Sequence, residues 1–175
     1  MLEACLAELA EAGYAGFSME SVAGRAGVGR STLYRHWNDR LRLVADALEL
    51  LNVQPARPAP QAGVAARDRV EQLLTHLSRA LVEGPVAGVV PALVHAAEQS
   101  PEVAAFWHEY SAHRRRALTD AVADAVREGE IRNVDPELAA VALSGAVFYR
   151  RLMTAEPMPA QDVRSLVELV LGQGG

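Results

Sequence analysis

Lysine is absent from this sequence of 175 residues, and all 17 of its basic residues are arginine. Together with 32 alanines, this usage is what a GC-rich coding sequence produces, so the overall composition reflects coding bias as much as function. The formal net charge is −5, which argues against a nucleic-acid partner because binding a polyanion depends on cationic contacts. The total must therefore be weighed against the distribution of charge along the chain.

Cysteine is nearly absent as well. The single Cys5 cannot form a disulfide within the chain, which fits a reducing compartment. No basic residue precedes Arg25, whereas a signal peptide begins with basic residues. Every apolar run is broken by Pro, Gly or a charge before it reaches the roughly 20 residues of a membrane helix. These absences predict a cytoplasmic protein without a membrane partner.

Helical periodicity dominates the residues that are present. Half of the chain is hydrophobic (50%) and 22% is charged, as in ordinary globular proteins. No strand-like alternation bounded by turn residues occurs. We therefore expect an all-α fold of eight or nine helices. Their expected bounds are the N-terminus to Gly13, Ser18 to about Ala26, Gly29 to Trp37, Asp39 to Leu51, Val70 to Leu81, a short helix interrupted by Pro91, Pro101 to Glu128, Pro136 to Thr154, and Pro159 onward.

A proline-rich segment at residues 53–63 has no periodic apolar face and predicts a loop. It separates a small N-terminal domain, placed at residues 1–46, from a larger one at 47–175. The small domain contains a basic window, residues 24–42, which has five arginines and one acidic residue, Asp39. The window carries +4, so the rest of a chain whose total is −5 carries −9.

Residues 18–37, SMESVAGRAGVGRSTLYRHW, have the layout of a helix-turn-helix. Ser18 can cap the first helix, and Gly27 can adopt the positive φ that the tight turn needs. A miniature core is expected from Val22, Val28 and Leu33, with Trp37 closing it. Hydrogen-bond donors for phosphates and base edges remain on the outer face of the second helix, namely Arg30, Ser31, Thr32, Tyr34, Arg35 and His36.

At these residues the sequence resembles the TetR family of bacterial transcriptional repressors. The segment AGVGRSTLYRHWNDRLRLV, Ala26 to Val44, is similar to that family's turn, recognition helix and following helix. Residues 127–153, REGEIRNVDPELAAVALSGAVFYRRLM, are similar to the C-terminal domain of one TetR branch. The resemblance implies a helix-turn-helix DNA-binding domain followed by a helical ligand-binding and dimerisation domain. It also implies a homodimer, an operator of double-stranded DNA and a small-molecule effector.

The resemblance also implies which residues contact DNA. It implies backbone contacts from Thr32, Tyr34, His36 and Arg40, and positions near the bases for Arg30, Ser31 and Tyr34. With the capping residue Ser18 and the outer-face donor Arg35, the predicted DNA contacts are Ser18, Arg30, Ser31, Thr32, Tyr34, Arg35, His36 and Arg40. Taken singly, exposed arginines are more often merely solvated, Tyr34 could belong to the core, and His36 could simply cap the helix end. Two features depart from the family pattern: Gly29 stands where a capping residue is usual, and Met1 already lies within the first helix. Either residues ahead of Met1 are missing, or the family's basic arm is absent.

Two further sites are expected in the C-terminal domain. An aromatic group next to apolar helices could line an effector pocket, formed by Leu77, Val90, Val94, His95, Phe106, Trp107 and Tyr110, although plain core packing is the alternative. A glycine in the middle of a helix costs about 1 kcal/mol relative to alanine unless close packing requires it. On that ground Gly145 predicts a crossing partner helix, in a dimer interface with Val141, Phe148, Tyr149, Leu166 and Val170; packing within the chain is the alternative.

No motif for a metal, a cofactor or catalysis is found. Glu109 and His113 are one helical turn apart, but His108 lies on another side of the helix and no metal-binding motif is present. Neither a nucleophile elbow nor a phosphate-binding glycine loop occurs. The sequence therefore predicts no metal, no cofactor and no enzymatic activity. The expected function is a dimeric, ligand-responsive transcriptional regulator, most simply a repressor. The alternatives are an all-α small-molecule binding module without operator binding and a helical-bundle enzyme.

Overall fold

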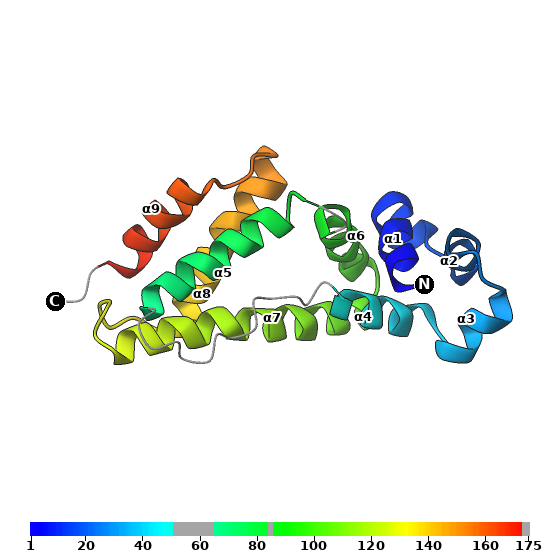
Figure 1. The fold of residues 1–175 in the computed structure, drawn as a ribbon, viewed down its shortest axis with the longest axis horizontal. Helices are drawn as coiled ribbons and strands as arrows, with labels where there is room; N and C mark the ends of the chain where they lie inside the picture. The colour runs from blue at the N-terminus through cyan, green and yellow to red at the C-terminus, as the bar shows by residue number, and fades with distance from the viewer. Residues whose placement is uncertain (51–64, 84–85, 173–175) are drawn as a thin grey trace. The chain divides into compact units, whose positions relative to one another are not determined.

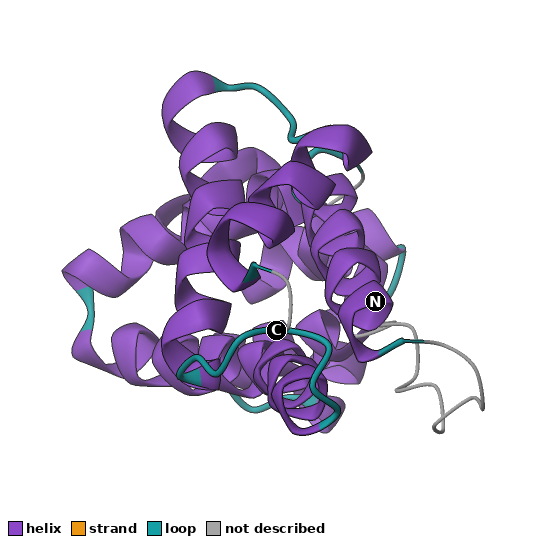
Figure 2. Ribbon diagram, turned by 90° about the vertical axis from the view of Figure 1, so that its left-hand side faces the viewer, coloured by secondary structure: helices purple, strands orange, loops and turns teal. Residues whose placement is uncertain are grey.

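The computed structural model describes residues 1–50, 65–83 and 86–172. The described residues form helices joined by short loops and contain no strand (Figures 1 and 2). The expected all-α class, an N-terminal helix-turn-helix domain followed by a helical C-terminal domain, is confirmed. The helices are α1 (Leu2–Gly16), α2 (Met19–Ala26), α3 (Arg30–His36), α4 (Arg40–Leu50), α5 (Ala66–Ala80), α6 (Val86–Gln99), α7 (Pro101–Arg127), α8 (Pro136–Tyr149) and α9 (Ala160–Leu171).

The chain divides into two compact units. The first comprises Met1–Val53 and Glu83–Glu109, so it contains α1 to α4, α6 and the start of α7. The second comprises Gln54–Val82 and Tyr110–Gly175, with α5, the rest of α7, α8 and α9. The domain boundary expected at residue 46 stays a prediction. The proline-rich loop expected at residues 53–63 lies outside the described residues.

Helix α1 forms the centre of the first unit. Cys5, Leu6 and Leu9 are buried on it, and α1 packs against α2, α4 and α6. Gly13, the predicted end of this helix, has the non-helical angles φ 66° and ψ 173°, but the chain returns to helical geometry and α1 ends at Gly16. Gly13 is therefore a kink within α1 and not its end, and the turn after it buries Tyr14.

Helix α6 approaches α1 at Gly88. A Cβ atom built at Gly88 would lie 2.8 Å from the Cβ of Ala10 and 3.1 Å from its Cα. Real Cβ atoms do not approach this closely, so the α1–α6 contact requires a glycine here. The predicted interruption at Pro91 is wrong, since α6 is continuous from Val86 to Gln99 with Pro91 inside it.

The second unit packs α5, α8 and α9 against one another. Buried Ser78 on α5 donates to the carbonyl of Met158 over 2.7 Å and accepts from its N–H over 3.2 Å, which fixes the loop before α9. Arg69 on α5 pairs with the buried Asp124 of α7 at 2.8 Å. Helix α8 ends at Tyr149 and a π-helical turn follows at Arg150–Thr154, so the helix expected to reach Thr154 changes its geometry over its last five residues.

Candidate nucleic-acid interface

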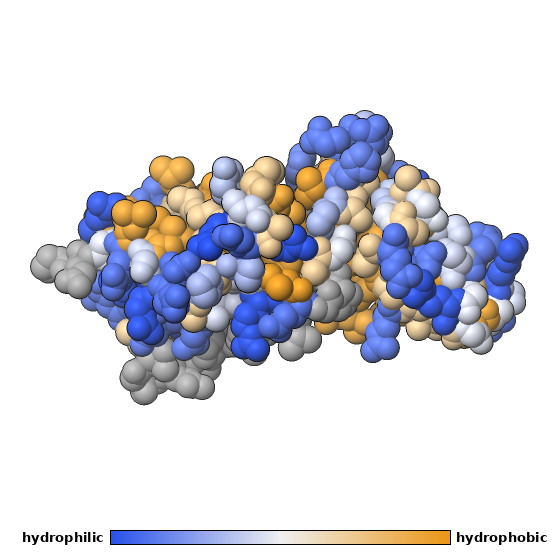
Figure 3. Space-filling view, turned by 90° about the horizontal axis from the view of Figure 1, so that it is seen from above, coloured by the Kyte–Doolittle hydropathy of each residue, from blue (hydrophilic) through white to orange (hydrophobic). Residues whose placement is uncertain are grey.

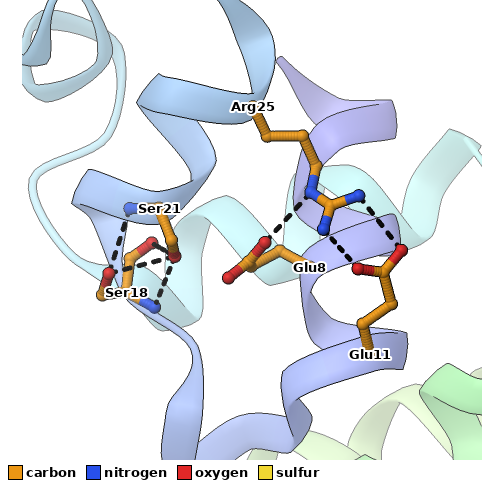
Figure 4. A network of polar contacts seen from close by, with 5 residues as sticks. All are labelled: Glu8, Glu11, Ser18, Ser21 and Arg25. Atoms are coloured by element: carbon orange, nitrogen blue, oxygen red, sulfur yellow. Dashed lines mark hydrogen bonds and ion pairs between the residues drawn. The ribbon is translucent and has the colours of Figure 1, made fainter.

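Helices α2 and α3 form the predicted helix-turn-helix. The Ser18 hydroxyl accepts a hydrogen bond from the Ser21 N–H over 3.0 Å, and the Ser21 hydroxyl accepts from the Ser18 N–H over 3.3 Å (Figure 4). This reciprocal capping box fixes the start of α2. Gly27 ends the helix in the left-handed conformation with φ 65°, as the turn requires. Both local predictions are confirmed.

A small core holds the two helices together. Val22, Ala23 and Leu33 are buried, and Trp37 is 9% exposed and closes the core. The indole N–H of Trp37 donates to Asp46 on α4 over 2.9 Å, a bond for which the sequence carried no signal. Val28, expected in this core, is only half-buried, because it follows the left-handed Gly27 at the edge of the turn.

This core leaves the predicted DNA contacts outside. Leu33 is fully buried and so defines which side of α3 faces inward. Thr32 and the capping residue Ser18 are half-buried, and the other predicted contacts are exposed, namely Arg30, Ser31, Tyr34, Arg35, His36 and Arg40. The structure therefore brings five of them together on α3, with Arg40 at the first position of α4. Gly29 provides no side-chain cap for α3, as expected.

Arg25 belongs to the basic window but is engaged within the protein. Its guanidinium donates to Glu8 over 3.0 Å and to Glu11 over 3.1 Å, and so joins α2 to α1 (Figure 4). The hydrogen bond from Arg25 lowers the pKa of Glu11. Arg42 is likewise paired, at 3.4 Å from Asp46. The charge of +4 counted along the sequence therefore overstates what α3 and its flank present to a partner.

Glu20 carries no signal in the sequence, but the fold places it beside α3. The Tyr34 hydroxyl donates to Glu20 Oε1 over 3.3 Å, and Arg30 Nη1 lies 3.9 Å from the same oxygen. Partial desolvation, then the Glu20 charge and hydrogen bond, raise the pKa of Tyr34 above its ordinary value of 10.0. A tyrosine is already protonated at neutral pH, and this shift makes loss of the Tyr34 proton still less favourable.

Tyr14 is a second residue without a sequence signal, because 26 positions separate it from its partner Arg40. The Arg40 guanidinium lies over the Tyr14 ring, in the geometry of a cation–π contact. Tyr14 is also stacked on Phe17, with ring centroids 6.4 Å apart. No periodicity or motif links α1 to the start of α4, so only the fold could reveal the pair.

The residues of the predicted dimer interface lie on α8 and α9. Val141 is 45% exposed and Tyr149 64% exposed, and no described atom lies within 4 Å of a Cβ built at Gly145, neighbouring positions aside. Phe148, Leu166 and Val170 are half-buried. Leu138, Met153 and Leu169, not predicted, are exposed as well, and Figure 3 shows apolar side chains at the surface near α9. We call the exposed apolar residues of α8 and α9 the α8–α9 face.

The residues of the predicted effector pocket are distributed over both compact units. Val90 is buried, Phe106 and Trp107 are half-buried, and Val94 and His95 are exposed, all in the first unit. Half-buried Leu77 and Tyr110 belong to the second unit. The pocket accordingly stays a prediction.

Across residues 1–50, 65–83 and 86–172, no three His, Cys, Asp or Glu side chains lie together in a way that could hold a metal ion. Over the same ranges, none of the helices combines the length and apolar character needed to cross a bilayer.

Comparison with known proteins places the chain in a family. A family model for bacterial regulatory proteins of the tetR family matches residues 1–47, and one for the tetracyclin repressor-like C-terminal domain matches residues 60–170. The HTH-type transcriptional regulator YdeS of Bacillus subtilis is 28% identical over 171 residues, covering 95% of this chain and 84% of YdeS.

Solved structures share the fold over nearly the whole chain. A TetR-family transcriptional regulator from Rhodococcus sp. is 27% identical, with a TM-score of 0.75 over 97% of this chain and 95% of that one. AibR, solved in complex with isovaleryl coenzyme A and operator DNA, is 21% identical, with a TM-score of 0.68 over 98% of this chain and 96% of its own. The chain belongs to the tetR family of bacterial transcriptional regulators.

Proposed function

We propose that this regulator is a homodimeric, ligand-responsive repressor that binds a palindromic operator through α3. The observation that carries the proposal is the arrangement of α3, where buried Leu33 turns Arg30, Tyr34, Arg35 and His36 toward solvent. Such donors can bind phosphate oxygens and base edges in a major groove. Two copies of α3 in a dimer would meet successive grooves of a palindrome, about 34 Å apart.

The dimer is supported by the α8–α9 face. Leu169 is 78% exposed and Leu138 68% exposed, and large apolar side chains gathered at the surface of two packed helices favour an interaction site. The open space at Gly145 would let a partner helix approach α8 closely. We therefore propose that the α8–α9 face packs against its copy in a second chain.

The proposal that a small molecule controls this regulator rests on one similar structure and on the aromatic residues of α7. AibR, which shares this fold, was solved with both an acyl coenzyme A and operator DNA. We propose that a small molecule binds beside Phe106 and Trp107, the half-buried aromatic residues of α7 in the first unit. Bacterial operator DNA lies in the cytoplasm, so we propose that the regulator acts there. We also propose that it regulates by binding alone and catalyses no reaction.

The test is binding to duplexes that carry palindromes from the upstream region of the gene. The protein should prefer one of them to a scrambled duplex, and its affinity should fall steeply with salt, because each neutralised phosphate adds about −0.9 to the slope of log K against log salt concentration. Tyr34→Ala and Arg40→Ala should weaken binding without loss of helicity. Arg164→Ala, an exposed arginine of α9 in the other unit, is the matched control.

Equal binding of palindromic and scrambled duplexes would refute operator recognition. A protein that bound small molecules but no duplex at low salt would instead fit the alternative, an all-α small-molecule binding module.

A further inference from the structure

One carboxylate oxygen already engages two of the proposed DNA contacts. Glu20 Oε1 accepts from the Tyr34 hydroxyl over 3.3 Å and lies 3.9 Å from Arg30 Nη1. Both partners are accessible, since Tyr34 is 46% exposed and the Arg30 side chain 71% exposed. An anionic oxygen that binds a guanidinium and a phenol hydroxyl makes the interactions that a phosphate oxygen would make in a complex with DNA.

The position of Glu20 is fixed by the start of α2. Ser18 is the N-cap, so Glu20 is the second residue of the helix and belongs to its first turn. A carboxylate at this end of a helix is stabilised by the backbone N–H groups and the helix dipole. The capping box between Ser18 and Ser21 holds that turn in place. Glu20 is therefore a charge anchored beside α3.

From this arrangement we propose that Glu20 is an intramolecular competitor of the operator phosphates, which holds Arg30 and Tyr34 in the DNA-free protein and limits its affinity for DNA. The inference rests on the proposed operator binding. When DNA binds, Arg30 and Tyr34 exchange the carboxylate for phosphate oxygens, and breaking their interactions with Glu20 reduces the net gain in free energy. The remaining Glu20 charge then faces the DNA backbone and opposes binding further.

Glu20→Gln tests this competition, because it removes the charge and keeps the shape of the side chain. We expect the dissociation constant for the palindromic duplex to fall about 1.4- to fivefold at fixed salt, the range that exposed ion pairs provide. Glu98→Gln, which removes the charge of an exposed glutamate on α6 in the same unit, is the matched control and should change the constant much less.

A double-mutant cycle separates competition from a general charge effect. In a Tyr34→Phe background the hydroxyl that donates to Glu20 is absent, so the gain from Glu20→Gln should shrink. Thermal unfolding of each variant establishes that the fold is intact.

The outcomes are distinct. If Glu20→Gln binds no better than Glu98→Gln, or binds more weakly, or if its gain is unchanged in the Tyr34→Phe background, the competitor role is overturned while operator binding stands. If the wild-type protein does not distinguish the palindromic from the scrambled duplex, the proposed function and this inference both fail.

Discussion

The guanidinium carbon of Arg40 lies 4.4 Å from the centroid of the Tyr14 ring, so a buried aromatic of α1 supports the first residue of α4. Arg40 is exposed and stands directly after the loop that follows α3. A guanidinium held over a ring loses less freedom when it binds a phosphate than one that is free in solution. We therefore expect Tyr14 to affect DNA binding through the position of Arg40.

Tyr14→Leu should weaken operator binding. An exposed cation–π contact contributes about 0.5–1 kcal/mol, which corresponds to a two- to fivefold rise in the dissociation constant. Tyr14→Phe keeps the ring and should bind nearly as well as the wild type. Titration of a labelled duplex by fluorescence anisotropy measures both. Equal losses for Leu and Phe would assign the effect to the hydroxyl group rather than to the ring.

Gly88→Ala should destabilise the first unit. The new Cβ would overlap Ala10, and overpacking of this kind costs about 1–3 kcal/mol. Because alanine improves helix propensity by about 1 kcal/mol, the net loss in the free energy of unfolding should lie between about 0 and 2 kcal/mol. Urea denaturation measures it.

Gly24→Ala is the matched control for Gly88→Ala, because no described atom lies within 4 Å of a Cβ at Gly24, apart from the helix itself and the chain neighbours. This substitution should stabilise the protein. A second control combines Ala10→Gly with Gly88→Ala, which removes the nearest of the clashing atoms, so the double variant should lose less stability than the sum of the two single losses. Equal gains at Gly88 and Gly24 would contradict the close α1–α6 contact.

Leu169→Glu should break the proposed dimer. The Leu169 side chain is 78% exposed in the single chain, so the substitution leaves the fold of that chain intact but places a charge in an apolar interface. Sedimentation velocity should show the mass of one chain instead of two. Leu50→Glu, which alters an exposed leucine of the first unit, should leave the mass unchanged. A dimer that survives Leu169→Glu would place the interface elsewhere.

The stability of the protein should depend on His76 at mildly acidic pH. Burial, then the charges of Arg114 and Arg79, lower the pKa of His76 below its ordinary value of 6.5. The unfolded chain therefore takes up a proton near pH 6.5 that the folded protein resists. The contribution of neutral His76 to stability is complete above this pH and is lost as the pH falls from it toward the folded pKa.

Urea denaturation of the wild type and of His76→Gln at pH 7.5 and pH 5.5 measures this dependence. The loss of stability between the two pH values should be smaller in His76→Gln than in the wild type. His95→Gln, at an exposed position on α6, is the control and should retain the wild-type loss. Identical losses in all three proteins would exclude His76 as the cause.

The sequence by itself determined the all-α class and the helix-turn-helix, because these depend on short-range chemistry. The Ser18 cap and the left-handed Gly27 follow from interactions within a few residues, and the burial of Leu33 follows from the apolar pattern of two adjacent helices; all three are as predicted. The same local pattern indicated which side of α3 faces solvent. Because the cap, the turn and the apolar pattern all indicate the same motif, residues 18–37 were enough to predict the helix-turn-helix.

Only the tertiary structure decided which polar side chains of the helix-turn-helix are already paired within the protein and which are free to bind a partner. Arg25 is joined to Glu8 and Glu11, and Glu20 engages Tyr34, across 14 to 17 positions of sequence that no helical period connects. Helix α1 continues past the kink at Gly13 to Gly16, and the turn after the kink buries Tyr14, which the local sequence did not indicate. A count of charges along the chain cannot distinguish a paired arginine from an exposed one, since pairing depends on how separate helices pack in space.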